Sequence, residues 1–190
     1  MRKIKLGVLI SGRGSNMQAL IKAGQDHDFP AEVVCVITND NKAAGLKIAK
    51  QAEISAFVVE NNPLDADKIH EILVQHKVHL VCLAGFMRIL KPDFLAKWHN
   101  KVVNIHPSLL PSFKGLSAQE QALKAGVKIT GCTVHYVTPE VDAGTIIAQT
   151  AVPVLPNDDI QSLSERILIE EHKCYVEAVR LIAENINHSS

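Results

Sequence analysis

Short apolar runs recur along the chain and predict buried strands. Most are nearly continuous in apolar residues, as in strands that are covered on both faces of a parallel sheet. Five of them fall before residue 106, at residues 4–10, 33–37, 57–59, 80–84 and 102–105.

The segments between these runs carry apolar residues at helical spacing, at residues 17–23, 43–52 and 65–75. Asn16, Asn41 and Asp65 stand near the starts of these segments, which predicts that they are N-caps. Because strand and helix alternate, the sequence predicts an α/β fold with an open, mostly parallel sheet and helices on both faces.

The second half of the chain departs from this alternation. Residues 128–137 and 145–152 predict two strands, and the loop between them holds Pro139 and Gly144, which suit a turn. We therefore expect an antiparallel strand near the C-terminal part of the sheet. Apolar residues at helical spacing from Asp159 onward predict a long amphipathic helix. No linker or repeat interrupts the pattern, so we expect one domain over residues 1–190.

Charge and composition exclude several classes of protein. Twenty Lys and Arg residues balance twenty Asp and Glu residues, so no net charge draws the chain to nucleic acid or an anionic membrane. No apolar run approaches the roughly 20 residues of a membrane helix, and the N-terminus has no secretory cleavage site. We expect a cytoplasmic protein whose partners are small molecules.

The four cysteines are far apart in sequence and lie among apolar neighbours, which predicts reduced thiols in the core rather than zinc ligands or disulfides. They are Cys35, Cys82, Cys132 and Cys174.

Three loops with unusual residues directly follow predicted strands, at residues 11–16, 85–90 and 104–111. In open α/β sheets, ligands bind outside the carboxyl ends of the strands, near the point where the strand order reverses. We therefore expect these three loops to converge on one crevice.

The first loop, SGRGSN at residues 11–16, has glycines that let backbone N–H groups approach an anion at the start of a helix. It is neither the lysine-containing P-loop nor the dinucleotide fingerprint. The loop predicts a phosphate site, and a plain strand-to-helix turn is the alternative.

The third loop, NIHPSLLP at residues 104–111, places Asn104 and His106 two apart on an extended chain, so both project to the same side. Acyl transfer uses an amide that donates a hydrogen bond to the oxyanion and an imidazole that transfers protons. A buried structural histidine is the alternative.

Asp142 is a candidate to orient the His106 imidazole and stabilise its protonated form, unless it is only a turn residue. A metal site made of His106, His135 and Asp142 is disfavoured, because no compact ligand spacing supports it.

The second loop, GFMRIL at residues 85–90, offers apolar side chains and free backbone to a flat aromatic ligand, with simple packing as the alternative. Glu171, on the C-terminal helix, could accept a hydrogen bond from a ligand amine or hydroxyl, or could simply be solvated.

These motifs, together with LA at residues 83–84 and VDAG at 141–144, resemble the phosphoribosylglycinamide formyltransferases of purine synthesis, in the 10-formyltetrahydrofolate-dependent formyltransferase family. The resemblance covers nearly the whole chain in the right order. It implies a Rossmann-like formyltransferase fold and transfer of a formyl group to the amine of glycinamide ribonucleotide. It also implies 10-formyltetrahydrofolate as co-substrate, no metal, and a monomer or homodimer.

The resemblance carries over residue by residue. It implies catalysis by Asn104, His106 and Asp142. It implies that the ribonucleotide contacts Gly14, Ser15, Asn16 and Glu171. It implies that the folate contacts Met87, Arg88, Ile89, Leu90, Asn104, Thr138, Pro139, Glu140, Val141 and Asp142.

Two departures from the family pattern affect substrate contacts. Ser117 and Gln119 stand where relatives often carry histidines, and residues 60–65 lack the arginine that some relatives use near the folate tail. Lys68 is a candidate substitute for that arginine.

Three other functions remain as alternatives. A methionyl-tRNA formyltransferase is expected to carry a further C-terminal domain and a basic surface, and a formyltetrahydrofolate deformylase a domain before the first strand. A non-catalytic protein that binds phosphorylated metabolites is disfavoured by the joint presence of Asn104, His106 and Asp142.

Overall fold

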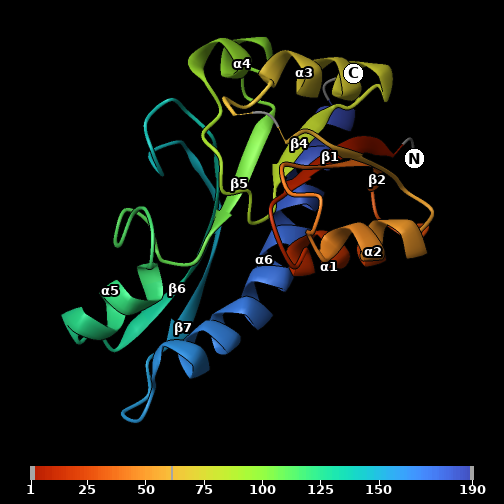
Figure 1. Ribbon diagram of the computed structural model, residues 1–190. Helices are drawn as coiled ribbons and strands as arrows, with labels where there is room; N and C mark the ends of the chain where they lie inside the picture. The colour runs from red at the N-terminus through yellow and green to blue at the C-terminus, as the bar shows by residue number, and fades with distance from the viewer. Residues whose placement is uncertain (1–2, 61, 189–190) are drawn as a thin grey trace.

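Seven strands form one sheet in the order β3-β2-β1-β4-β5-β6-β7 in the computed structural model, which describes residues 3–60 and 62–188 (Figure 1). The strands are β1 (Ile4–Ile10), β2 (Ala31–Thr38), β3 (Ser55–Val58), β4 (Leu80–Leu83), β5 (Val102–His106), β6 (Ile129–Tyr136) and β7 (Ile146–Pro153). Strands β1 to β5 are parallel, and β6 runs antiparallel to both β5 and β7. The predicted mostly parallel sheet with an antiparallel strand is confirmed.

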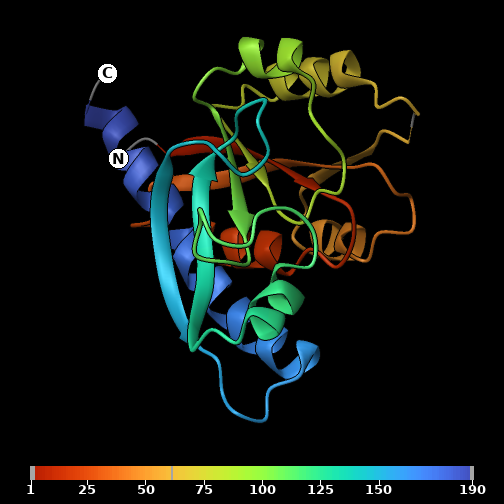
Figure 2. The same ribbon diagram turned by 90° about the vertical axis from the view of Figure 1, so that its left-hand side faces the viewer.

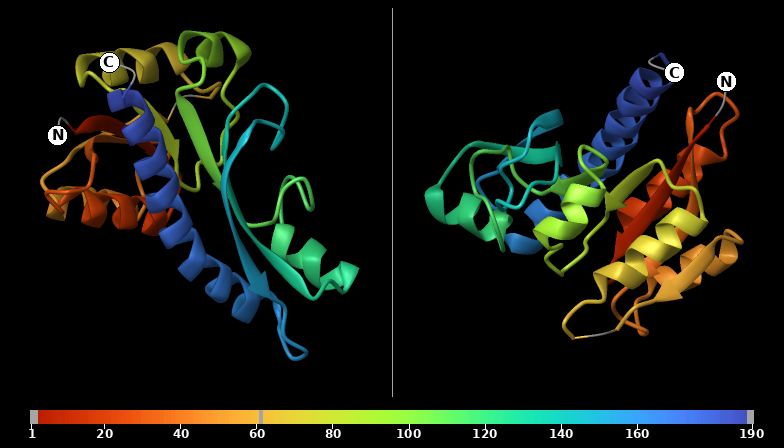
Figure 3. Two further views of the ribbon diagram at one scale, coloured as in Figure 1. Left: turned by 180° about the vertical axis from the view of Figure 1, so that it is seen from behind. Right: turned by 90° about the horizontal axis from the view of Figure 1, so that it is seen from above.

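Helices cover both faces of this sheet, as predicted (Figures 1 and 3). They are α1 (Ser15–Gly24), α2 (Gly45–Gln51), α3 (Ala66–Gln75), α4 (Pro92–Lys97), α5 (Ala118–Ala125) and α6 (Ile160–His188). Because successive strand residues point to opposite faces, Leu6 and Val8 of β1 pack with α1, α2 and α6. Leu9 packs instead with α3 and α4 on the other face.

Of the predicted N-caps, only Asp65 is confirmed, since its side chain accepts a hydrogen bond from the Lys68 amide at 2.9 Å. The prediction is wrong for Asn16 and Asn41, because Gly14 and Ala44 occupy the N-cap positions of α1 and α2. Asn16 lies inside the first turn of α1, where its side chain bonds to a distant helix instead. Helices α4 and α5, with six and eight residues, were not predicted.

The strand order reverses between β1 and β4, which places the loop after β1 beside the loop after β4. The loop after β5 lies next to them (Figure 2). All four cysteines are free and buried, as predicted. No helix in the described ranges is both long and apolar enough to cross a bilayer.

Candidate active site

The loop after β1 is held in place by close contacts of two of its glycines with Gly45. The Gly45 amide donates to the Gly12 carbonyl at 3.0 Å, and a Cβ on Gly14 would lie 3.0 Å from the Cα of Gly45. Gly14 itself has φ +74°, a conformation that favours glycine. Helix α1, which begins at Ser15, has neither a side-chain cap nor an acidic residue in its first turn. Its first backbone amides are therefore suited to an anion.

Ser11 ties this loop to the loop after β4. Its hydroxyl donates to Asn39 Oδ1 and accepts from the Met87 amide at 2.7 Å, while its own amide donates to the Gly85 carbonyl at 3.2 Å. This role of Ser11 could not be predicted from the sequence, because these partners are distant in the chain. The convergence of the loops is thus partly fixed by one hydroxyl.

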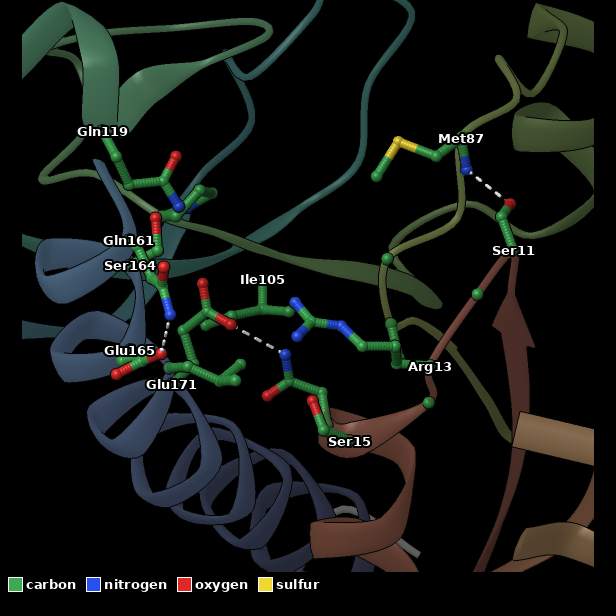
Figure 4. A pocket seen from close by; sticks show the side chains of 17 residues that line it. Ser11, Arg13, Ser15, Met87, Ile105, Gln119, Gln161, Ser164, Glu165 and Glu171 are labelled. Carbon is green, nitrogen blue, oxygen red and sulfur yellow. Dashed lines mark hydrogen bonds between the residues drawn. The ribbon is translucent and has the colours of Figure 1, made fainter. Parts of the chain in front are cut away.

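A cavity of about 710 Å³ opens beside these loops (Figure 4). All three predicted loops line it, through residues that include Ser15, Met87 and Pro107, and α6 closes the other side. The predicted convergence is confirmed. Gln119, at one position where relatives often carry histidine, also lines the cavity, whereas Ser117 does not.

Asn16 and Glu171 meet in the wall of this cavity. The Asn16 amide donates to Glu171 Oε2 at 2.8 Å, and both side chains are largely buried. Burial raises the pKa of Glu171 above its ordinary value, although the Asn16 hydrogen bond and the charge of Arg13 act in the opposite direction. Asn16 Oδ1 is buried and has no partner among the described residues. Asn16 Oδ1 is enclosed, so the acceptor that this wall offers to an amine or hydroxyl of a ligand is the Glu171 carboxylate.

A second group of polar side chains gathers at the β5–β6 boundary. Asn104 pairs with His135 across the two strands, and Asn104 Nδ2 lies 3.5 Å from His135 Nε2. Asp142 lies between two imidazoles, with His106 Nδ1 3.4 Å from its Oδ2 and His135 Nε2 3.6 Å from its Oδ1. The predicted trio of Asn104, His106 and Asp142 thus lies together, joined by His135.

Both ring nitrogens of His106 face acceptors. Nε2 lies 2.9 Å from the Phe113 carbonyl, and Nδ1 faces the Asp142 carboxylate. Only a ring that carries protons on both nitrogens can donate to both groups. A neutral His106 ring can therefore donate to only one of these two acceptors at a time.

Several contacts hold Asp142 ionised. Burial would raise its pKa, but hydrogen bonds from His135 and from the Gly115 amide (2.8 Å), together with the nearby His106, bring the pKa below its ordinary value. Each of the two histidines faces the Asp142 carboxylate with one ring nitrogen. The other ring nitrogen faces a backbone carbonyl, that of Phe113 for His106 and that of Tyr136 for His135.

His135 is the member of this cluster that the sequence did not mark as a catalytic candidate. Its place opposite Asn104 depends on the β5–β6 register, which no local motif encodes. Although His106, His135 and Asp142 meet, the described residues include no group of histidine, cysteine or acidic side chains arranged to hold a metal ion.

The histidine cluster and the 710 Å³ cavity lie on either side of β5. Ile105 and Pro107 line the cavity, whereas Asn104, His106 and Asp142 do not. Alternate residues of a strand point to opposite faces, so the chain order itself produces this division. Since His106 is the last residue of β5, the two sides of the strand meet at its carboxyl end.

The predicted folate residues divide into exposed and buried groups. Met87 and Ile89 are 69% and 80% exposed, which is unusual for large apolar side chains, whereas Leu90 packs in the core and leaves only its backbone to a ligand. In the later loop, Thr138, Pro139, Glu140 and Val141 are exposed and line neither of the two cavities described here.

A second cavity of about 360 Å³ lies beside the first, and Met87 lines both. Its cations are Arg88, which donates to Asn62 Oδ1 at 3.2 Å, and Lys91. Lys68, the candidate substitute for the missing arginine, does not line it and pairs with Glu71 at 3.4 Å.

Comparisons with known proteins agree with this geometry. The model of the formyl transferase family matches residues 4–179. The phosphoribosylglycinamide formyltransferase of Haemophilus influenzae is 41% identical over 95% of this chain and 87% of its own length. The crystal structure of phosphoribosylglycinamide formyltransferase from Anaplasma phagocytophilum has 56% identity and a TM-score of 0.94, covering 97% of this chain and 88% of that one.

A trifunctional purine biosynthetic protein, adenosine-3 of Bos taurus, is 49% identical over 96% of this chain. The chain spans only 18% of the length of that protein.

Proposed function

The chain belongs to the formyl transferase family, and we propose that it transfers a formyl group from 10-formyltetrahydrofolate to the amine of glycinamide ribonucleotide. The product is formylglycinamide ribonucleotide, an intermediate of purine synthesis. One observation carries the proposal, namely that a loop suited to a phosphate and a histidine–carboxylate cluster flank the carboxyl end of β5.

The ribonucleotide occupies the 710 Å³ cavity, with its phosphate at the amides of Gly14, Ser15 and Asn16. Its glycinamide end approaches Glu171, whose carboxylate accepts from its N–H groups while Asn16 holds that carboxylate in place. This orientation leaves the amine close to the end of β5, where it can reach a carbonyl held on the His106 side.

The folate lies over the exposed side chains of Met87 and Ile89, and the loop at residues 138–141 covers it from the other side. Its ring hydrogen-bonds to backbone groups of Arg88 and Leu90. Because Met87 lines both cavities, it is the boundary at which the two substrates meet.

The amine attacks the formyl carbon, and the carbonyl oxygen becomes an oxyanion that accepts hydrogen bonds from Asn104 Nδ2 and from His106. The new C–N bond to the glycinamide forms as the bond to the folate nitrogen breaks. The attacking nitrogen loses one proton, and the leaving folate nitrogen gains one. His106 mediates this transfer, which requires the substrate to replace the Phe113 carbonyl at Nε2.

Asp142 stabilises the imidazolium form of His106, and His135 keeps Asp142 ionised and oriented. These groups supply the polarisation and the proton, so the proposed reaction needs 10-formyltetrahydrofolate as a co-substrate and no metal. We place the reaction in the cytoplasm, with small molecules as the partners of a monomer or homodimer.

The proposal is tested by incubating the purified protein with 10-formyltetrahydrofolate, with and without glycinamide ribonucleotide, while separating the products. We expect formylglycinamide ribonucleotide only when the ribonucleotide is present. Release of formate without the ribonucleotide would identify a deformylase. Formylation of methionyl-tRNA would identify a methionyl-tRNA formyltransferase. Binding of the ribonucleotide without either reaction would identify a non-catalytic binding protein.

A further inference from the structure

Arg13 is a residue of the loop after β1 to which neither the phosphate motif nor the proposed reaction gives a role. Its neighbours Gly12 and Gly14 are held against Gly45 by the backbone contacts described above. Because the loop packs on that side, the Arg13 side chain projects from it and lines the 710 Å³ cavity (Figure 4).

The guanidinium group of Arg13 is left without a fixed partner by the described part of the chain. Arg13 is exposed, and no hydrogen bond or ion pair to its guanidinium is formed by the described residues. It acts on Glu171 only through its charge, while the Glu171 carboxylate takes its hydrogen bond from Asn16. The five donors of the guanidinium are therefore available to a ligand.

Arg13 is needed to balance the negative charges that line the cavity. Glu165 and Glu171 bring two carboxylates to the lining, and among the described residues of the lining Arg13 is the only one with a positive charge. A phosphate monoester that enters the cavity carries up to two negative charges, which the two carboxylates repel. Backbone amides alone supply partial charges, whereas a guanidinium supplies a full charge and a planar pair of donors that match two phosphate oxygens.

Resting on the proposed function, we propose that Arg13 binds the phosphate group of the substrate, closing over it from the side opposite the Ser15 and Asn16 amides. Arg13 thereby sets the preference of the enzyme for a phosphorylated substrate. The residue takes no part in proton transfer, so it affects the KM of the ribonucleotide and not kcat.

The test compares glycinamide ribonucleotide with its dephosphorylated riboside in the wild type and in Arg13→Gln. We expect the KM for the ribonucleotide to rise roughly 10- to 100-fold in the variant, as for a lost hydrogen bond to a charged group, with kcat nearly unchanged. The kinetics of the riboside should be the same in both proteins. Arg13→Lys should recover part of the loss, because it keeps the charge but not the paired donors.

Two controls separate this role from an indirect one. Lys22→Gln removes an equal charge from the last turn of α1, the helix that follows the Arg13 loop, away from the cavity lining, and should leave both KM values unchanged. Glu171→Gln, alone and combined with Arg13→Gln, tests whether Arg13 acts through Glu171. An Arg13→Gln effect that disappears in the Glu171→Gln background, or that is equal for ribonucleotide and riboside, would overturn the inference.

Calorimetry with ribose 5-phosphate distinguishes failure of this inference from failure of the proposed reaction. If the wild type transfers no formyl group, weaker binding of ribose 5-phosphate by Arg13→Gln still supports Arg13 as a phosphate-binding residue. Equal binding by the two proteins would contradict it, whether or not the enzyme turns over.

Discussion

The loop after β1 and the cluster around Asp142 lie at the same edge of the sheet but are built in different ways. The loop uses backbone amides, and its shape is fixed by the contact between Gly14 and Gly45. The cluster uses side chains, with Asp142 shared by His106 and His135. The first arrangement suits binding of a fixed charge, and the second suits movement of a proton. Changes in the loop should therefore affect KM, and changes in the cluster should affect kcat.

The largest effect is expected from Asp142→Asn, which keeps the shape of the side chain but removes the charge that faces the two imidazoles. We expect kcat to fall by about 10²–10⁴-fold, the range typical of lost general acid–base catalysis. Steady-state kinetics should give a KM for the ribonucleotide within a few-fold of the wild type. Asp28→Asn, at a carboxylate that is 92% exposed, is the control. A large rise in KM with kcat preserved would show that the cluster binds the substrate and does not transfer a proton.

The next largest effect is expected from Gly14→Ala. An Ala at φ +74° is strained, and its Cβ would crowd the Gly45 backbone. We expect the KM for the ribonucleotide to rise about tenfold as the amides move, with a smaller change in kcat, measured by steady-state kinetics.

Gly126→Ala is the matched control for this substitution, because Gly126 also has positive φ but a Cβ there would meet no atom within 4 Å. Urea unfolding should give a loss of about 1–2 kcal/mol for Gly126→Ala, from the backbone conformation alone. Gly14→Ala should lower the free energy of unfolding by more than Gly126→Ala does, because its Cβ also crowds Gly45. Equal losses would contradict the role given to the Gly14–Gly45 contact.

A smaller effect is expected from Ser11→Ala, which removes the hydroxyl that joins the loops after β1 and β4. Each lost hydrogen bond is worth about 1 kcal/mol, so KM for both substrates should rise several-fold. Ser55→Ala, at an exposed serine of the edge strand β3 that lines neither cavity, should have no such effect. A rise in KM for only one substrate would show that the two loops bind their substrates independently.

The smallest effect concerns stability in acid. The pKa of Asp142 lies below its ordinary value of 3.8, so its ionised form stabilises the fold above about pH 4 and this contribution is lost as the pH falls through the lowered pKa. We expect the free energy of unfolding of the wild type to exceed that of Asp142→Asn by more at pH 6 than at pH 3. Urea titrations at both values test this, and a difference that does not change with pH would contradict it.

Much of the fold could be predicted from the hydrophobic pattern, because buried parallel strands are continuous apolar runs. Strand β1 begins and ends where the pattern predicts, and the long helix α6 was expected from Asp159 onward. The extent of the domain, residues 1–190, stays a prediction.

The candidate site could be predicted only where its residues share a local motif. Asn104 and His106 stand two apart, and the loop at residues 11–16 is a single segment. His135 and Ser11 depend on strand register and on contacts between distant loops. The division of the site by β5 also follows from the alternation of a strand, but it became evident only with the cavity.

The most direct test of this division is formyl transfer from 10-formyltetrahydrofolate to glycinamide ribonucleotide by the wild type and His106→Ala, with kcat and KM measured separately. We expect the wild type to transfer the group and the variant to lose at least about 100-fold in kcat, with both KM values within a few-fold. A variant that keeps its kcat, or whose defect lies in KM for the ribonucleotide, would contradict the assignment of proton transfer to the His106–Asp142 cluster.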